Sequence, residues 1–160
     1  MKYLAVLGAV ALAISLVACG GSNNSSSQPT NPGTGTWSAT VAATSGSQLG
    51  SFTFNMMQNN TALSGSNMNF SNMGTLGSCF GAGTVMNGQM GPGMMNGGNV
   101  DMTMSWTPSG STLTNTMVMK GTMATGMGSG SGTFTLTGQT SGCTSQNGTF
   151  SMTRTSSSIM

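Results

Sequence analysis

Apolar and small polar side chains alternate one for one along much of this chain from Trp37 onward, and few folds accommodate that pattern. The run 133–137 reads Thr-Phe-Thr-Leu-Thr, and the run 149–153 reads Thr-Phe-Ser-Met-Thr. A period of two residues places one face of a β-strand against a core and the other face in water. Parallel strands, which are covered on both faces, would instead be apolar throughout. The alternation therefore predicts an all-β domain built from antiparallel strands.

The segment 100–120 predicts the best-defined hairpin, because polar turn residues separate two alternating runs. If Thr107 pairs with Thr112, Met102 lies opposite Met117 on the inner face of the hairpin. The whole inner face would comprise Val100, Met102, Met104, Trp106, Leu113, Asn115, Met117 and Met119.

Turn-forming residues divide the alternating region into about eight strands with short connections. Sequential hairpins favour an antiparallel meander, and closing it into a small barrel would remove sheet edges that an uncharged surface leaves unprotected. A β-sandwich is the alternative. The arrangement is similar to the small barrels of the calycin and lipocalin type, a resemblance that implies fold alone. The turn signals are Gly46, Asn59-Asn60, Gly110, residues 126–132 and Asn147-Gly148.

Two glycine-rich segments interrupt the alternation and predict loops between strands. The first, 83–98, reads GTVMNGQMGPGMMNGG, and the second covers 124–132. A chain of 160 residues suits one domain. We place that β domain at residues 37–156.

Charged side chains are almost absent, since the chain has three Lys or Arg, one Asp or Glu and no His. In the predicted hairpin, Asp101 and Lys120 are diagonal neighbours on the outer face, where a solvated ion pair adds little stability. Nucleic-acid binding and attraction to acidic lipid headgroups both need clustered basic residues, which this chain lacks. We therefore expect no nucleic-acid partner. The charged residues are Lys2, Asp101, Lys120 and Arg154.

This chain has few of the side chains that enzymes use for catalysis. General acid–base catalysis relies chiefly on His, Asp, Glu, Lys, Tyr or Cys, and a Ser-His-Asp triad cannot form without His. A single carboxylate also rules out the paired carboxylates of glycoside hydrolysis. We therefore expect no catalytic residue and no enzyme activity.

Residues 1–19 have the layout of an export signal. Lys2 precedes an apolar run that is shorter than the about 20 residues needed to span a bilayer. The run ends in Leu16-Val17-Ala18-Cys19, which resembles the lipobox of bacterial lipoproteins. The resemblance implies cleavage of the signal peptide 1–18, a diacylglyceryl group on the Cys19 thiol and an acyl chain on its new amine. Several acyl chains anchor a protein stably to a membrane.

The residues after Cys19 extend this interpretation. Gly20 and Gly21 resemble the sorting pattern of outer-membrane lipoproteins in enteric bacteria, so we expect a lipid-anchored protein of the bacterial cell envelope, at the outer membrane. Residues 19–36 would comprise the lipidated cysteine and a flexible linker rich in Gly, Ser, Asn and Pro. The alternatives are an ordinary signal peptide cleaved near Ala18 and an uncleaved anchor helix.

Cys79 and Cys143 remain once Cys19 is assigned to lipid. Two cysteines in an exported domain predict one disulfide bond. A metal or redox pair is the alternative, although the chain has no CxxC motif and no His.

The 17 methionines of the chain have two interpretations. Methionine fills irregular cores, which accounts for the six methionines predicted to face inward from strands. Thioether sulfur also binds Cu(I), and the segment containing Met86, Met90, Met94 and Met95 resembles methionine-rich copper-binding segments. The six inward methionines are Met56, Met68, Met102, Met104, Met117 and Met119.

Three functions are therefore expected from the sequence. The first is a non-catalytic envelope lipoprotein with a structural or partner-binding barrel and no cofactor beyond its lipid. The second is a carrier that holds a small apolar ligand inside the barrel. The third is periplasmic Cu(I) binding by the methionine-rich loop. The carrier's lining would comprise Trp106, Met102, Met104, Met117, Met119, Phe134 and Phe150.

Overall fold

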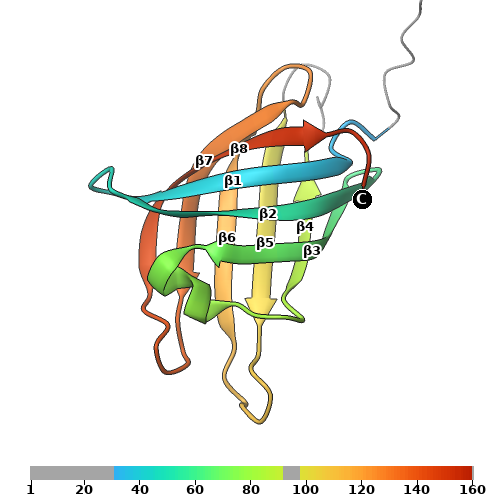
Figure 1. Cartoon of the computed structure of the whole chain (residues 1–160). Helices are drawn as coiled ribbons and strands as arrows, with labels where there is room; N and C mark the ends of the chain where they lie inside the picture. Colours follow the sequence, from blue (N-terminus) through green and yellow to red (C-terminus); the bar gives the residue numbers. More distant parts are fainter. Residues whose placement is uncertain (1–30, 92–97, 160) are drawn as a thin grey trace, which may run out of the picture.

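The strands of the computed structural model, which describes residues 31–91 and 98–159, pair in chain order and close on themselves (Figure 1). β1 pairs with both β2 and β8, and each neighbouring pair is antiparallel. The predicted antiparallel barrel is thus confirmed, and the sandwich is wrong. The elements are β1 (Gly35–Ala43), β2 (Gln48–Asn59), β3 (Ala62–Asn72), the 3-10 helix η1 (Gly74–Cys79), β4 (Val85–Met90), β5 (Asn99–Trp106), β6 (Asn115–Met123), β7 (Ser129–Thr137) and β8 (Gln146–Ser156).

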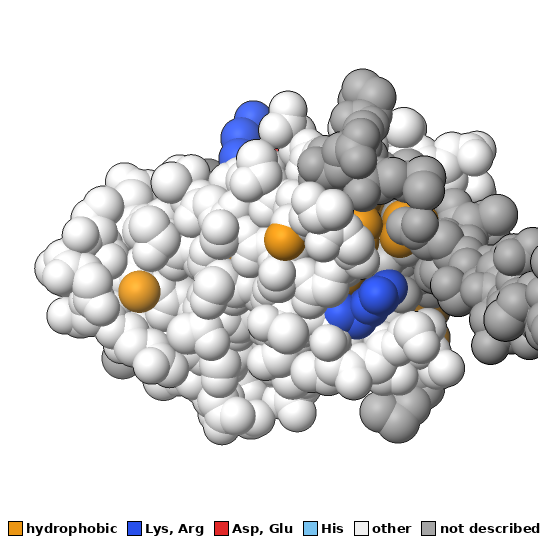
Figure 2. Space-filling view, turned by 90° about the horizontal axis from the view of Figure 1, so that it is seen from above, with side chains coloured by type: hydrophobic (Ala, Val, Ile, Leu, Met, Phe, Trp, Pro, Cys, Tyr) orange, Lys and Arg blue, Asp and Glu red, His pale blue; other side chains and the backbone are white. Residues whose placement is uncertain are grey.

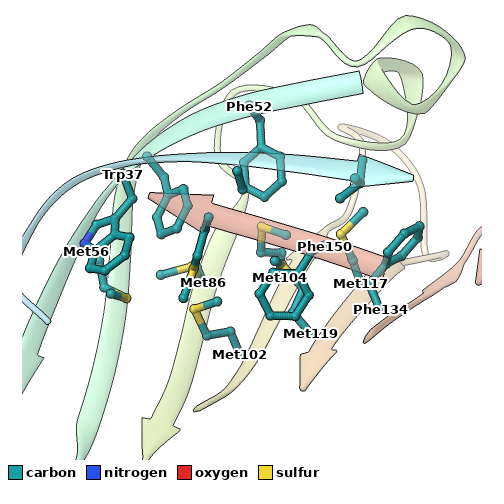
Figure 3. Close-up of a cluster of buried hydrophobic side chains, with 14 of the residues drawn as sticks. Trp37, Phe52, Met56, Met86, Met102, Met104, Met117, Met119, Phe134 and Phe150 are labelled. Atoms are coloured by element: carbon teal, nitrogen blue, oxygen red, sulfur yellow. The ribbon is translucent and has the colours of Figure 1, made fainter. Parts of the chain in front are cut away.

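Inward-facing side chains fill the barrel. Along β1, the side chains of Trp37, Ala39 and Val41 are buried, and Ser38 and Thr40 between them are partly exposed. Methionines from several strands meet the phenylalanine rings near the centre of the barrel (Figure 3). This arrangement is the physical outcome of the two-residue alternation, which gives every strand one apolar face. The buried methionines are Met56, Met73, Met86, Met90, Met102, Met104, Met117, Met119, Met123, Met127 and Met152.

Strand β4 lies inside the segment 83–98 that was predicted as a loop, so that prediction is wrong for Val85–Met90. Met86 and Met90 point into the core, and Val85, Asn87 and Gln89 are exposed. The alternation is present but hidden, because the inner position between the two methionines is Gly88. A side chain there would overlap the backbone of β5 at Asp101. Residues 92–97 of the same segment lie outside the described residues.

Two segments that were predicted as turns because they contain glycine are parts of strands. Asn147 and Gly148 belong to β8, and residues 129–132 belong to β7, although both segments carried turn signals. A side chain on Gly148 would overlap the Ala42 carbonyl oxygen, so glycine allows the neighbouring backbone to approach. By contrast, Gly46 and Gly110 do lie in connections and have positive φ angles of 87° and 77°.

The β5–β6 hairpin has a longer connection than the sequence indicated. Trp106 pairs with Asn115, which moves the register by two residues and places Met102 opposite Met119 instead of Met117. Leu113 therefore leaves the ladder, and its side chain is 48% exposed instead of facing inward. Hydrogen bonds within the connection hold it outside the sheet, including Ser111 N–H to the Pro108 carbonyl at 3.0 Å. A shift by two preserves the face of every paired residue.

The two ends of the barrel differ. We call one end the terminal end, because the first residue of β1 and the last residue of β8 lie there. We call the opposite end the distal end. It carries the four connections 44–47, 73–84, 107–114 and 138–145. In Figure 1 the hairpin connections of β5–β6 and β7–β8 extend below the barrel, on the side away from residues 31–34.

Residues 31–34 close the terminal end. The Trp37 indole N–H donates to the Gly33 carbonyl at 2.9 Å, and the Gly33 N–H donates to the side-chain oxygen of Gln58 at 2.7 Å. Arg154 donates to the Pro32 carbonyl at 2.6 Å. The folded part therefore begins before Trp37, because residues 31–34 and the first residues of β1 are held by side chains from β2 and β8.

Candidate functional site at the distal end of the barrel

The side chains predicted to line an internal ligand cavity are packed against one another instead. Met102, Met104 and Met117 have no exposed surface, and Met119, Phe134 and Phe150 are at most 3% exposed. Figure 3 shows these side chains pointing toward one another inside the barrel. Almost none of their surface is exposed, so this part of the interior is filled. The exception is Trp106, which is partly exposed at the distal end.

The four methionines of the predicted copper segment are divided between two settings. Met86 and Met90 are core residues of β4, with exposed fractions of 1% and 0%. Met94 and Met95 lie outside the described residues. The structure therefore places half of the predicted ligand set in the core, where packing accounts for it.

The predicted disulfide is confirmed: Cys79 and Cys143 are bonded, with their Cα atoms 4.8 Å apart. The bond joins the end of η1 to the β7–β8 connection across 64 positions of sequence. Ser78, beside it, donates its hydroxyl to the Gly142 carbonyl at 2.7 Å. Two connections of the distal end are thus held together both covalently and by a hydrogen bond.

The Asn115 side chain also holds two connections of the distal end together, through hydrogen bonds. Its side chain is fully buried, at the first position of β6. Its amide nitrogen donates to the Cys79 carbonyl at 3.0 Å and to the Thr140 hydroxyl at 2.5 Å. Its amide oxygen accepts from the N–H groups of Gln139 and Thr140 at 2.8 and 3.0 Å. All four hydrogen-bonding positions of the amide are therefore used, as a buried polar group requires.

A groove of about 390 Å³ lies next to the disulfide and the Asn115 hydrogen bonds, and we call it the Trp106 groove. Its lining combines two kinds of side chain. Trp106, Pro108 and Leu113 are apolar, and the others carry hydroxyl groups: Ser78, Ser111, Thr140 and Ser141.

A second hollow of about 540 Å³ is lined in part by Gly77 and residues 80–82, so the segment 77–82 borders both hollows. It forms where β3 separates from β4, since the two strands pair only from Ala62 to Gly65. Phe70 and Phe80 stack in its wall, with ring centroids 4.9 Å apart. The rings continue the aromatic row of Phe52 and Phe54, which anchors the segment to the core.

Charged groups lie away from the distal end. Among the described residues, Lys120 Nζ and Asp101 Oδ2 form an ion pair at 3.0 Å on the outer face, with exposed fractions of 66% and 52%. They face each other directly instead of diagonally, because of the shifted hairpin register. Arg154, the remaining charged residue of the described part, is near the end of β8. The face in Figure 2 is mostly white, which marks backbone and side chains that are neither hydrophobic nor charged.

Comparisons with protein-family models, with curated proteins and with solved structures yielded no match. Across residues 31–91 and 98–159, no helix has the length and apolar character needed to cross a membrane. The same residues hold no group of three or more His, Cys, Asp or Glu side chains that could bind a metal. Cys19, the predicted lipidation site, lies outside the described residues.

Asn115 and the Trp106 groove were not identified as a site from the sequence. A signal for the first was available, because Asn115 is a lone amide in a row of inward apolar residues that includes Met117 and Met119. A buried amide needs partners, which points to a hydrogen-bonded network. The groove left no comparable signal, because it joins three connections that are distant in the sequence.

Proposed function

We propose that this chain is a lipid-anchored, non-catalytic protein of the bacterial cell envelope whose barrel serves a structural or partner-binding role. The observation that carries the proposal is the segment Leu16-Val17-Ala18-Cys19 at the end of an apolar run. The Gly- and Ser-rich residues after Cys19 suit a linker between a membrane anchor and a folded domain.

The layout of the barrel supports an outward-facing binding role. The chain enters the barrel at the terminal end, where residues 31–34 are hydrogen bonded to Gln58, Trp37 and Arg154. An anchor attached to this segment would leave the distal end, with its grooves and long connections, free to meet a partner. The absence of His and Glu from the chain supports a role without catalysis.

The packing of the interior gives no support to the carrier alternative. An apolar ligand would have to displace side chains such as Met104 and Met117, which have no exposed surface. Copper binding is also not favoured, since Met86 and Met90 are core residues of a strand.

The proposed lipid anchor can be tested by intact-protein mass spectrometry after expression of the full chain in a bacterium with an outer membrane. We expect membrane-extracted protein that lacks residues 1–18 and carries the added mass of a diacylglyceryl group and an acyl chain. Replacement of Cys19 by Ser (C19S) is the matched control, and it should abolish the added mass. Recovery of an unacylated chain from the membrane, or of one that retains residues 1–18, would contradict the proposal.

A further inference from the structure

The two tryptophans of the chain have different surroundings. Trp37 is fully buried, and its indole N–H donates to the Gly33 carbonyl. Trp106 is only partly buried, and its N–H has no hydrogen-bond partner among the described residues. Its ring packs beside Gly81, where an added Cβ would come within 2.9 Å of the six-membered ring. Packing explains Trp37 completely, whereas Trp106 keeps surface and a polar group available for a ligand.

The Trp106 groove combines two kinds of contact surface. Trp106, Pro108 and Leu113 supply rigid or branched apolar surface, and Leu113 is 48% exposed. The rest of the lining carries hydroxyl groups, on Ser78, Ser111, Thr140 and Ser141. The volume of about 390 Å³ is within the range of small-molecule sites.

Two hydroxyl-bearing residues of the lining, Thr140 and Ser78, are held in place before any ligand binds. Thr140 is hydrogen bonded to Asn115 through both its backbone N–H and its hydroxyl. Ser78 is adjacent to the Cys79–Cys143 disulfide and bonds to Gly142. Rigid walls lower the entropic cost of binding, which is a property expected of a binding site.

No charged side chain lines the groove, and the three charged residues of the described part lie toward the terminal end. A charged ligand would lose hydration here without gaining an ionic partner. A purely apolar ligand would cover the hydroxyl groups and the indole N–H without offering them hydrogen bonds. The ligand that suits both kinds of lining side chain is neutral, rich in hydroxyl groups, and has an apolar face.

We propose that the Trp106 groove binds an uncharged carbohydrate chain. The C–H face of a sugar ring packs on the electron-rich face of an indole, and the ring hydroxyl groups bond to serine and threonine hydroxyl groups. The assignment names the partner class for the partner-binding role proposed above. It rests on that role but not on the lipid anchor, so a failure of the anchor test would leave it standing.

The experiment uses the mature chain with its disulfide intact, in a detergent without a sugar headgroup. Cellohexaose, chitohexaose, maltohexaose and mannohexaose are titrated separately, with tryptophan fluorescence and calorimetry as readouts. We expect saturable binding of at least one hexasaccharide and a shift of the Trp106 emission. Replacement of Trp106 by Ala (W106A) should weaken that binding by about tenfold or more.

Two controls separate binding from folding. Ser109→Ala, in the same connection but outside the groove lining, should bind like the wild type. In W106A, the remaining emission comes from Trp37, so an unchanged wavelength shows that the core is intact. The proposal is overturned if folded protein binds none of the four saccharides, if W106A binds them unchanged, or if the groove takes only an apolar peptide.

Discussion

Asn115 connects three chain segments through one buried amide. Its partners are Cys79 at the end of η1 and residues 139–140 of the β7–β8 connection. An apolar residue at this position would fill the space but would leave two backbone N–H groups without an acceptor. The amide therefore fixes where the distal connections lie, in addition to its contribution to packing.

Replacement of Asn115 by Ala should lower the free energy of unfolding by about 2 kcal/mol, because the N–H groups of Gln139 and Thr140 lose their acceptor. For a domain of this size the melting temperature should fall by roughly 6–10 °C. Asn147→Ala is the matched control, since Asn147 is exposed on β8 and its replacement should change the melting temperature little. Equal effects of the two substitutions in thermal unfolding would show that the Asn115 network contributes nothing specific.

At the level of elements, glycine decides how closely neighbouring strands approach. Gly121 of β6 lies opposite Gly132 of β7. A side chain on Gly132 would overlap the Lys120 carbonyl oxygen and come within 2.5 Å of the Gly121 Cα. Glycine at such positions allows the sheet to bend tightly enough to close into a barrel.

Gly132→Ala should therefore destabilise the barrel by about 2–3 kcal/mol, because the backbones of β6 and β7 would have to move apart. Gly128→Ala is the control, since nothing lies within 4 Å of an added Cβ there. That substitution should be neutral, or stabilising by up to about 1 kcal/mol. Urea unfolding measures both. A tolerated Gly132→Ala would mean that the strands are not held at this close approach.

Glycine also makes room for methionine side chains. An added Cβ on Gly130 would lie 2.7 Å from the sulfur of Met123 and 3.0 Å from the terminal methyl group of Met152. The same relation holds for Gly65 and Met86. Long, unbranched thioether side chains can occupy such irregular spaces, which explains why a core of this kind can be built mostly from methionine and phenylalanine.

At the scale of the whole molecule, the disulfide is a long-range covalent constraint on the described part of the chain. It links two connections of the distal end and closes a loop of 64 positions. Chain-entropy estimates for a loop of that length give a stabilisation of about 4 kcal/mol. The charged residues of the described part lie toward the terminal end, so no ion pair among them holds these connections.

Replacing both cysteines by alanine (C79A/C143A) should lower the free energy of unfolding by about 4 kcal/mol. Reduction of the wild-type protein should produce the same loss, because it removes the same constraint. Urea unfolding under oxidising and reducing conditions is the measurement. An unfolding midpoint that does not change on reduction would contradict a stabilising role for the bond.

Features that depend on local pattern could be predicted from the sequence. The alternation alone indicated the inward residues of β5, β7 and β8, since side-chain direction in a strand follows from position parity. The disulfide followed from cysteine number. Trp106 was predicted as a ligand-lining residue, but for the interior of the barrel instead of the distal end.

Tertiary structure decided what depends on close approach between distant segments. Gly88 hides the alternation of β4, and only the neighbouring backbone of β5 shows why glycine is required there. The β5–β6 register depends on hydrogen bonds within its connection, and the Trp106 groove depends on residues 78, 106 and 140 meeting at one end. A linear pattern encodes which face a side chain takes, but not how far apart two segments lie once the barrel has closed.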